Sequence, residues 1–269
     1  MRFDELERLL RRHAVLGTLE TYGEQDDGLG RYPLLRLTTP GRVVCLITAG
    51  FHGDEQAGPI TLAHHLAEVV DYAAARDVGL RVYPCINPSG FDAFTRYSRR
   101  GERPNNDCMR YELPGGALAG EVRGAAPFVA IHPHRGGPQE TRALVTDLLG
   151  VVPAAALDLH QDPYISGPVT YAYTFGPSGP FLPLLAASEA HVPAARSREV
   201  DVGVHTDPDG LIALHDGSVT DWMWRQGVPF TAALETTTDT PAGPRDAVNL
   251  IWIRGFIELA AGAGRQPRR

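Results

Sequence analysis

Hydrophobic and polar residues alternate along the chain in two patterns, one typical of buried strands and one typical of helices. Residues 42–50 (RVVCLITAG) form an apolar, β-branched run that ends at a glycine, which indicates a buried central strand. Residues 56–73 carry apolar side chains at helical spacing, and residues 79–86 (GLRVYPCI) form a second strand-like run. A strand, a helix and a strand in this order predict a βαβ unit.

Similar patterns continue on both sides of this unit. Strands are expected at 33–38, 154–160, 168–175 and 228–235, and helices at 3–12, 138–149, 179–191, 217–227 and 244–262. This alternation predicts an α/β fold of three layers, in which helices cover both faces of a mostly parallel sheet. The segment 88–136 is rich in Gly, Pro and Arg and has little periodicity, so we expect a long functional loop there.

The chain is expected to form a single domain over residues 1–269, with a core from about 33 to 262 and an N-terminal helix before it. Its 43% apolar and 21% charged residues are ordinary for a globular protein, which favours a folded chain over a disordered one. No shift in composition marks a linker, and no internal repeat is visible, so nothing in the sequence argues for a second domain.

The net charge of −7 disfavours a general affinity for nucleic acids or for anionic membranes, because both require a basic surface. A local basic run, formed by Arg96, Arg99, Arg100 and Arg103, is better explained by a small anionic ligand. The chain contains no lysine. Mechanisms that use a Schiff-base lysine or a P-loop lysine are therefore excluded.

The cysteines and the N-terminus indicate where the protein resides. Cys45, Cys85 and Cys108 cannot all pair with one another, and two of them lie in strand-like apolar runs, which favours a reducing compartment. The first twenty residues alternate charges with leucines at helical spacing, unlike a signal peptide. No stretch approaches the roughly 20 apolar residues of a membrane span. We expect a cytoplasmic protein.

Polar side chains that can carry chemistry lie at the ends of three predicted buried strands. His52 and Glu55 directly follow one strand, His160 ends another, and Glu235 ends a third. In open α/β sheets, ligands bind beyond the carboxyl ends of the strands. These four residues can therefore meet in one crevice although they are far apart in sequence.

A histidine and a glutamate three residues apart can bind one metal ion, and imidazole nitrogen with carboxylate oxygen suits zinc. His52 and Glu55 lie in the loop GFHGDEQAGP, whose glycines allow a steep turn at a strand end. A second pair with the same spacing, His65 and Glu68, lies inside a predicted helix, where a solvated helix surface explains it.

His160 and Glu235 each admit an alternative. A histidine at the end of a buried strand can be a core residue that is satisfied by hydrogen bonds. Glu235 follows an apolar strand, and a buried carboxylate is costly unless it has a cation, a hydrogen-bond network or a raised pKa. A nearby metal ion with its water would meet that requirement. Either Asp158 or Asp162 could accept a hydrogen bond from the second ring nitrogen of His160.

The order of several motifs resembles the zinc metallocarboxypeptidase family and its aspartoacylase-like and succinylglutamate desuccinylase-like relatives. The motifs are HGDE, NPSGFDAFTRYSRR, DCMR, the strand-end LH at 159–160 and the strand-end glutamate at 235. Together they extend from about residue 42 to residue 236. The resemblance implies a three-layer α/β/α fold with a mixed, mostly parallel sheet.

The resemblance also implies roles for individual residues. His52, Glu55 and His160 would bind one zinc ion, and Glu235 would act as general base and then as general acid. An arginine after the N-P-x-G motif would stabilise the oxyanion. Arg96 fits the aspartoacylase-like T-R-Y pattern and Arg100 fits the spacing of the peptidases, while Arg99 is a third candidate for substrate contact, so the choice stays open.

The family motif D-x-N-R corresponds to residues 107–110. It implies that Asp107 orients the first histidine ligand and that Arg110 binds the substrate carboxylate. The asparagine of the motif is replaced by Met109, and Asn105 or Asn106 could take its place in substrate binding.

The peptidases of the family also carry a tyrosine about twenty residues before the catalytic glutamate, and this chain has no tyrosine after Tyr173. His215 stands at that distance, but a loop histidine without a role explains it better. His132 and His134 could form a second metal site, although a solvated loop is again the simpler explanation.

The predicted function is a zinc-dependent hydrolase that cleaves an amide or peptide bond next to a substrate carboxylate, in the manner of a metallocarboxypeptidase. The substrate would be a small peptide or an N-acyl amino acid. One alternative is a deacylase of N-acyl amino acids, which the same site would serve. Another is a zinc-binding or ligand-binding module without catalysis, which the replaced asparagine and the missing tyrosine would allow.

Overall fold

A computed structural model of the 269-residue chain describes residues 1–122, 127–134 and 136–264. Its centre is an eight-stranded sheet. In spatial order the strands are β1 (Thr18–Asp26), β2 (Arg31–Thr38), β4 (Val78–Tyr83), β3 (Val43–Ala49), β8 (Ala155–Asp162), β13 (Thr231–Thr237), β9 (Thr170–Thr174) and β12 (Leu211–Ile212). The four central strands from β4 to β13 are parallel, whereas β2 and β9 run antiparallel to them at either side. The prediction of a mixed, mostly parallel sheet is confirmed.

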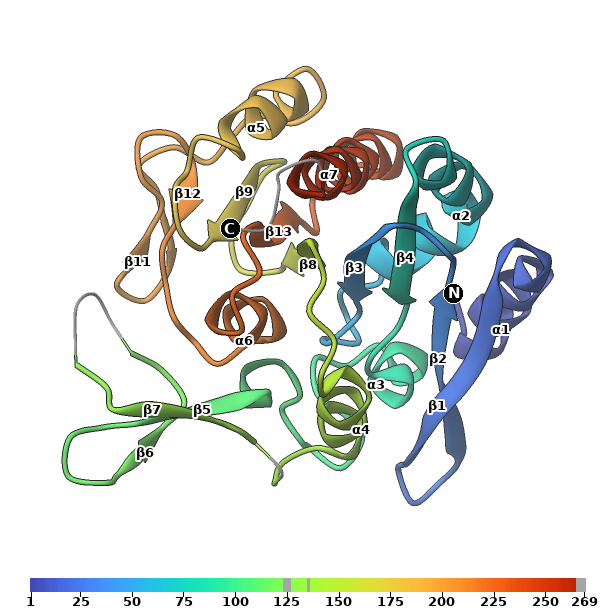
Figure 1. The fold of residues 1–269 in the computed structure, drawn as a ribbon, viewed down its shortest axis with the longest axis horizontal. Coiled ribbons are helices and arrows are strands. Elements are labelled where there is room, and N and C mark those ends of the chain that lie inside the picture. The colour runs from blue at the N-terminus through green and yellow to red at the C-terminus, as the bar shows by residue number, and fades with distance from the viewer. Residues whose placement is uncertain (123–126, 135, 265–269) are drawn as a thin grey trace.

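Helices cover both faces of the sheet (Figure 1). The helices are α1 (Phe3–Arg12), α2 (Ala57–Ala74), α3 (Pro88–Ala93), α4 (Gln139–Leu148), α5 (Leu182–Ser188), α6 (Val219–Arg225) and α7 (Ala242–Ala263). The long helices α2 and α7 pack against one face, and α4 and α6 against the other. No helix among the described residues is long and apolar enough to cross a membrane.

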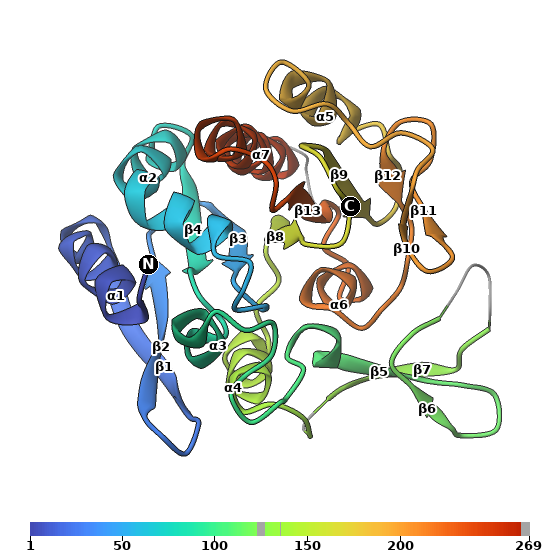
Figure 2. The same cartoon turned by 180° about the vertical axis from the view of Figure 1, so that it is seen from behind.

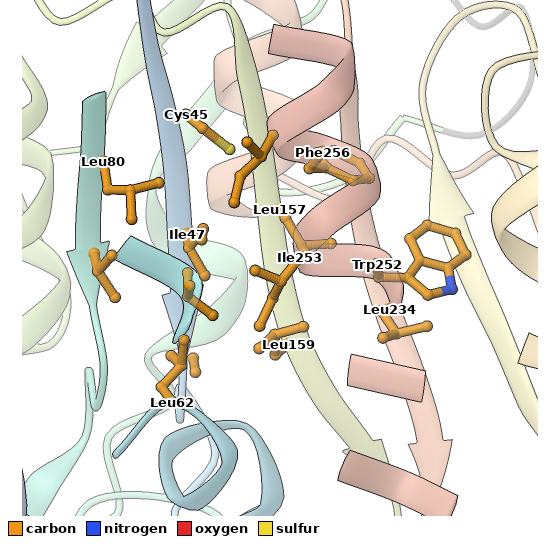
Figure 3. Packing of buried hydrophobic residues seen from close by; sticks show 14 of the residues in the cluster. Cys45, Ile47, Leu62, Leu80, Leu157, Leu159, Leu234, Trp252, Ile253 and Phe256 are labelled. Atoms are coloured by element: carbon orange, nitrogen blue, oxygen red, sulfur yellow. The ribbon is translucent and has the colours of Figure 1, made fainter. Parts of the chain in front are cut away.

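The central strands bury both of their faces, which explains their continuous apolar sequences. On one face, Ile47, Leu157 and Leu234 pack against α7, where Trp252 and Phe256 are fully buried (Figure 3). On the other face, the neighbouring strand residues belong to a second cluster. It joins Leu46 and Ala156 to the apolar sides of α4 and α6. Because successive strand residues point to opposite faces, each strand serves both clusters.

Three parts of the structure differ from the sequence predictions. Strand β1 was not predicted, because its sequence TLETYGEQD is mostly polar and it pairs only with β2 at the edge of the sheet. The expected loop over 88–136 contains α3 and a small sheet of β6 (Leu118–Ala119), β5 (Met109–Glu112) and β7 (Ala130–Pro133). The prediction of one long loop was wrong, because strands of two to four residues are too short to show a period.

The region between α5 and α6 was also incompletely predicted. It holds the short hairpin of β10 (Glu199–Asp201) and β11 (Val204–His205), followed by β12. The small sheet of β5 to β7 and this hairpin lie on the same side of the molecule, near α6 (Figure 2). A bridge between Val122 and His215 connects the two regions. This side of the molecule borders the candidate site described below.

Asp147, at the end of α4, joins this helix to the sheet. Its carboxylate accepts hydrogen bonds from Arg36, from Arg81 at 2.7 Å and from the Tyr83 hydroxyl at 2.5 Å. Burial alone would raise the pKa of Asp147, but these hydrogen bonds lower it below its ordinary value. The three donors therefore favour the ionised carboxylate.

Replacing Asp147 with alanine is expected to lower the free energy of unfolding by about 2–4 kcal/mol, because two arginines lose their shared partner. Urea unfolding at pH 7 measures this loss. The pKa of Asp147 is lower in the folded than in the unfolded state, so its stabilising effect is complete above the unfolded-state pKa and is lost as the pH falls through the folded-state pKa. The difference in unfolding free energy between the wild type and the variant should therefore shrink below about pH 4. The exposed Asp71→Ala is the control. An equal loss in both variants would contradict the role of Asp147.

Candidate metal centre

The loop between β3 and α2 brings His52 and Glu55 together. The turn is closed by the Glu55 backbone N–H, which donates to the His52 carbonyl at 3.3 Å, while the Gly53 N–H donates to the Arg96 carbonyl at 3.1 Å. Both side chains are buried, and His52 Nδ1 lies 2.6 Å from Glu55 Oε1. The two side chains that the sequence places at the end of this strand are therefore in contact with each other.

His160 reaches the same point from β8. Its Nδ1 lies 2.9 Å from Glu55 Oε2, and its Nε2 lies 2.7 Å from Asp158 Oδ2. The Thr48 hydroxyl donates to the other oxygen of Asp158 at 2.8 Å, which holds that carboxylate in place. Of the two aspartates that flank His160, Asp158 is the one that orients the ring. Asp162 accepts hydrogen bonds from the Tyr171 hydroxyl and from nearby backbone instead.

These three residues fit a metal ion. His52, Glu55 and His160 each offer one ligand atom, and these atoms all lie within 4.8 Å of one another. Two imidazole nitrogens and a carboxylate are a donor set typical of catalytic zinc, in which three protein ligands leave the fourth position open. No other such group of three was found in the part of the chain that the structure describes.

The electrostatics of the cluster favour a cation. Burial lowers the pKa of His52, so this ring is neutral at neutral pH, as a metal ligand must be. Burial also lowers the pKa of His160, but the carboxylates of Asp158 and Glu55 outweigh it and raise that pKa well above its ordinary value. The two carboxylates thus favour a positive charge at this position, which a proton or a metal ion can supply.

Glu235 lies beside the cluster. Its strand β13 runs parallel to β8, and Glu235 is the register partner of His160. The Glu235 Oε2 atom is fully buried and has no hydrogen-bond partner among the described residues. Burial raises the pKa of Glu235 well above its ordinary value, although His160 acts in the opposite direction. Glu235, His52 and His160 line one cavity of about 200 Å³.

The structure distinguishes the three candidate arginines. Arg96 lines the cavity, and its Nη1 donates to Glu55 Oε1 at 2.6 Å. Arg99 is held by Asp27 and Asp92, at 3.0 and 3.2 Å. Arg100 lies on the exposed side of the molecule and pairs with Asp26 at 3.3 Å. The oxyanion candidate that lies at the cluster is therefore Arg96, because carboxylates elsewhere bind the other two.

No family model and no curated protein sequence matches the chain. Solved structures do. A presumed metallopeptidase from Shewanella baltica matches with 24% identity and a TM-score of 0.75, covering 96% of this chain and 92% of its own. Bovine thrombin-activatable fibrinolysis inhibitor, in complex with tick carboxypeptidase inhibitor, matches with 13% identity and a TM-score of 0.66 over 98% and 97%. Murein-tripeptide amidase from Escherichia coli O157 matches with 19% identity and a TM-score of 0.51 over 93% of each chain.

The chain has the metallocarboxypeptidase fold. The resemblance that the motifs predicted is confirmed for the fold. The sequence identities are too low to show a shared activity. The His-Glu-His cluster, Glu235 and Arg96 lie around one cavity of this fold, and the sequence had left the choice among Arg96, Arg99 and Arg100 open.

Other predicted contacts are corrected by the structure. Arg110 bonds to the Asp107 carboxylate and to the carbonyls of Asn106 and Met109, at 3.0 Å each for the carbonyls. Asp107 thus contacts Arg110 where an orienting contact with His52 was expected, and the described lining of the cavity includes neither Asp107 nor Arg110. The physical reason is that Arg110 is on β5, whose small sheet lies outside the central one.

The structure also locates the residues at which this chain departs from the family motifs. Met109 is fully buried in the core, whereas Asn105 and Asn106 line the cavity. His215 does not line the cavity as described; its Nδ1 lies 2.7 Å from Asp221. Tyr173 of β9 lines it instead, opposite Ala233 in the register. Sequence reasoning missed Tyr173, although the alternating pattern TYAYT indicates that it shares a face with Tyr171.

The remaining histidines stay outside the candidate site. His65 and Glu68 form a 3.3 Å contact on the exposed side of α2. His132 contacts Glu112 at 2.7 Å on the exposed face of the small sheet. Neither pair gains a third ligand among the residues described, which agrees with the simpler explanations given for them.

Gly53 is expected to be essential to the metal centre of this metallocarboxypeptidase fold. An added Cβ would lie 2.0 Å from the Gly90 carbonyl carbon and 2.3 Å from the Phe91 nitrogen, both of them backbone atoms of α3. Gly53→Ala should therefore displace the loop and weaken zinc binding about 10-fold or more, since overpacking of this kind costs about 1–3 kcal/mol. A titration against a chromogenic chelator measures the affinity.

The matched control is Gly243→Ala in the first turn of α7, where an added Cβ meets nothing within 4 Å. This variant should keep the affinity of the wild type. An unchanged zinc affinity in Gly53→Ala would show that the close packing of the loop on α3 does not position the ligands.

Proposed function

We propose that this protein is a zinc-dependent hydrolase of amide bonds in small substrates that carry a carboxylate. The observation that carries the proposal is the convergence on one cavity of three potential zinc ligands and Glu235, whose Oε2 atom is buried and has no partner among the described residues. A site that only binds a metal does not need such a glutamate, because an unpaired buried carboxylate is costly.

When bound by His52, Glu55 and His160, zinc supplies a Lewis acid that activates water near neutral pH. Glu235 is the residue placed to accept a proton from the attacking water and to deliver it to the departing amine. Burial raises the pKa of Glu235, which makes its carboxylate a stronger proton acceptor than an exposed glutamate.

Arg96 is proposed to stabilise the oxyanion that develops on the carbonyl oxygen. In the described structure its guanidinium donates to Glu55, so it already lies at the ligand cluster. The ring of Tyr164 lies 5.2 Å from the guanidinium carbon and restricts its motion on one side. A fixed cation at the point where charge develops lowers the barrier, because it needs no reorganisation during the reaction.

Two reactions fit this site. The first is removal of a C-terminal residue from a peptide, for which the structural neighbours named as peptidases and as an amidase give support. The second is deacylation of an N-acyl amino acid, and one observation favours it: Arg96, the arginine at the ligand cluster, is the one in the aspartoacylase-like T-R-Y pattern. Asn105 is the proposed contact for the substrate carboxylate, because the Asn106 amide already donates to the Asp216 carbonyl at 3.2 Å and to its carboxylate at 2.8 Å.

Metal analysis combined with hydrolysis assays tests the proposal. We expect one zinc ion per chain, in line with the single ligand cluster of the described residues. Dipeptides blocked at the N-terminus and N-acyl amino acids form the substrate panel, and a chelator should abolish turnover until zinc is restored. Bound zinc without turnover across the panel would contradict the hydrolase and favour the non-catalytic binding module.

A further inference from the structure

We propose that Arg99 is a positioning residue for Arg96. It anchors residues 94–103, which form the arginine segment, in the path that brings Arg96 to the metal-ligand cluster. The sequence left Arg99 as a candidate for substrate contact, but the described lining of the cavity includes Arg96 and not Arg99. The inference rests on the proposed function, because it takes Arg96 as the residue that stabilises the oxyanion.

The arginine segment follows α3 and contains neither a helix nor a strand. Its path is therefore not fixed by the repeated backbone hydrogen bonds of a regular element. Next to the metal centre, the Thr95 N–H donates to the Gly90 carbonyl at 3.0 Å, and the Gly53 N–H donates to the Arg96 carbonyl at 3.1 Å. Beyond Arg96, two further arginine side chains tie the segment to the rest of the molecule.

Arg99 attaches the arginine segment to several elements at once. Its Nη1 donates to Asp27 Oδ2 at 3.0 Å and to the Tyr32 hydroxyl at 2.9 Å. Its Nη2 donates to Asp92 Oδ2 at 3.2 Å, and its backbone N–H donates to the Ser89 hydroxyl at 3.4 Å. These partners come from the turn between β1 and β2, from β2 itself and from α3, which packs against β2 (Figure 1). Arg99 therefore joins the segment both to the edge of the sheet and to a helix.

The carboxylate of Asp27 is itself held in place. Its side chain is buried, and its second oxygen accepts hydrogen bonds from the backbone N–H groups of Leu29 and Gly30, at 2.9 and 2.7 Å. Burial alone would raise the pKa of Asp27, but these two hydrogen bonds and the Arg99 guanidinium lower it below its ordinary value. Arg99 thus meets an ionised carboxylate that is fixed within a tight turn.

Arg100, the next residue along the chain, provides a comparison. Its Nη2 donates to Asp26 at 3.3 Å, and both of these side chains are exposed. Exposed ion pairs contribute little, because water and salt screen them. Loss of the cation beside a buried carboxylate such as Asp27 is costly by contrast. We therefore expect Arg99, and not Arg100, to fix the path of the arginine segment.

The anchor at Arg99 acts on Arg96 through the short length of chain between them. Three peptide units separate the two residues, so their Cα atoms lie at most about 11 Å apart. A fixed Arg99 limits how far Arg96 can withdraw from Glu55 Oε1, to which its Nη1 donates at 2.6 Å. A cation stabilises a developing oxyanion best when it needs no reorganisation during the reaction. Arg99 would therefore promote the reaction without touching the substrate.

Amide hydrogen exchange in Arg99→Gln tests the positioning and requires neither zinc nor turnover. We expect the Gly53 and Thr95 amides to exchange about 10-fold faster or more, because exchange of a hydrogen-bonded amide requires local opening. Arg100→Gln, the matched control, should keep both wild-type rates. The Ala156 amide, which is hydrogen-bonded in the central sheet, is the internal reference and should not change.

A second variant covers the case in which Arg99→Gln does not fold, which thermal melting detects. Arg99→Lys keeps the positive charge beside Asp27 but lacks the planar fork that contacts two carboxylates and a hydroxyl together. Its Gly53 and Thr95 amides should exchange faster than in the wild type, with a smaller change than in the glutamine variant.

Kinetics on a substrate from the panel of blocked dipeptides and N-acyl amino acids tests the effect on catalysis. Arg99→Gln should lower kcat about 10-fold and change KM less than about 3-fold, because an oxyanion contact is made in the transition state. In an Arg96→Gln background the same substitution should have little further effect on kcat, since residues that act through one another are not additive.

Three results would overturn the inference. One is wild-type exchange of the Gly53 and Thr95 amides in both variants of Arg99. Another is equal acceleration in Arg100→Gln or at the Ala156 amide. The third is a loss of kcat on Arg99→Gln that is undiminished when Arg96 is already replaced. Faster exchange at the two amides without cleavage of any substrate would support the positioning of Arg96 and contradict the hydrolase instead.

Discussion

Replacing Glu235 with glutamine is expected to reduce turnover by about 10²- to 10⁴-fold while zinc stays bound, because the variant keeps the shape of the side chain and loses its ability to accept a proton. The three proposed ligands, His52, Glu55 and His160, are untouched. The variant should also be at least as stable as the wild type, since burial disfavours the charge that the substitution removes.

The measurement is kcat together with zinc content on the same preparation. Glu189→Gln serves as the control, because Glu189 is an exposed glutamate on the surface that pairs with Arg196. Loss of turnover accompanied by loss of zinc would instead make Glu235 a residue that holds the metal centre together. Full activity in the variant would rule out Glu235 as the general base.

Replacing His160 with alanine is expected to remove zinc binding, turnover and part of the stability together. Two ligands remain, which is too few for a tight zinc site. The substitution also leaves the Asp158 carboxylate, which is fully buried, without the ring that it contacts. Loss of one partner from a buried charged pair typically costs about 3–5 kcal/mol.

Zinc titration during thermal unfolding tests this expectation. Added zinc should raise the melting temperature of the wild type, because a ligand that binds only the folded state stabilises it. It should not raise that of His160→Ala. His191→Ala, a change at an exposed histidine outside the cluster, should respond like the wild type. A zinc-dependent shift of equal size in His160→Ala would show that zinc binds elsewhere.

Most of the central sheet could be predicted because its strands and helices have strong periods. The apolar run at 42–50 became β3 (Val43–Ala49), and the predicted helix at 3–12 matches α1. Elements without such a signal were missed. The polar edge strand β1 is one example, and the short strands between 88 and 136 are another, because their existence depends on pairing with distant segments.

The same distinction applies to the candidate site. The sequence by itself predicted four residues of the candidate site, His52, Glu55, His160 and Glu235, because each lies at the end of a predicted buried strand, where a parallel sheet binds ligands. Their convergence follows from the order and direction of the central strands. Those strands are in turn specified by local apolar patterns.

Only the tertiary structure decided which of the neighbouring polar residues belong to the site. Arg96 lies at the cluster while Arg99 and Arg100 pair with distant carboxylates, and Arg110 turns to Asp107 instead of the cavity. The cavity also gains Asp201 and Asp216, which no motif indicated. The reason is that these residues lie on irregular segments. The path of such a segment depends on long-range packing and ion pairs, and neither leaves a periodic pattern in the sequence.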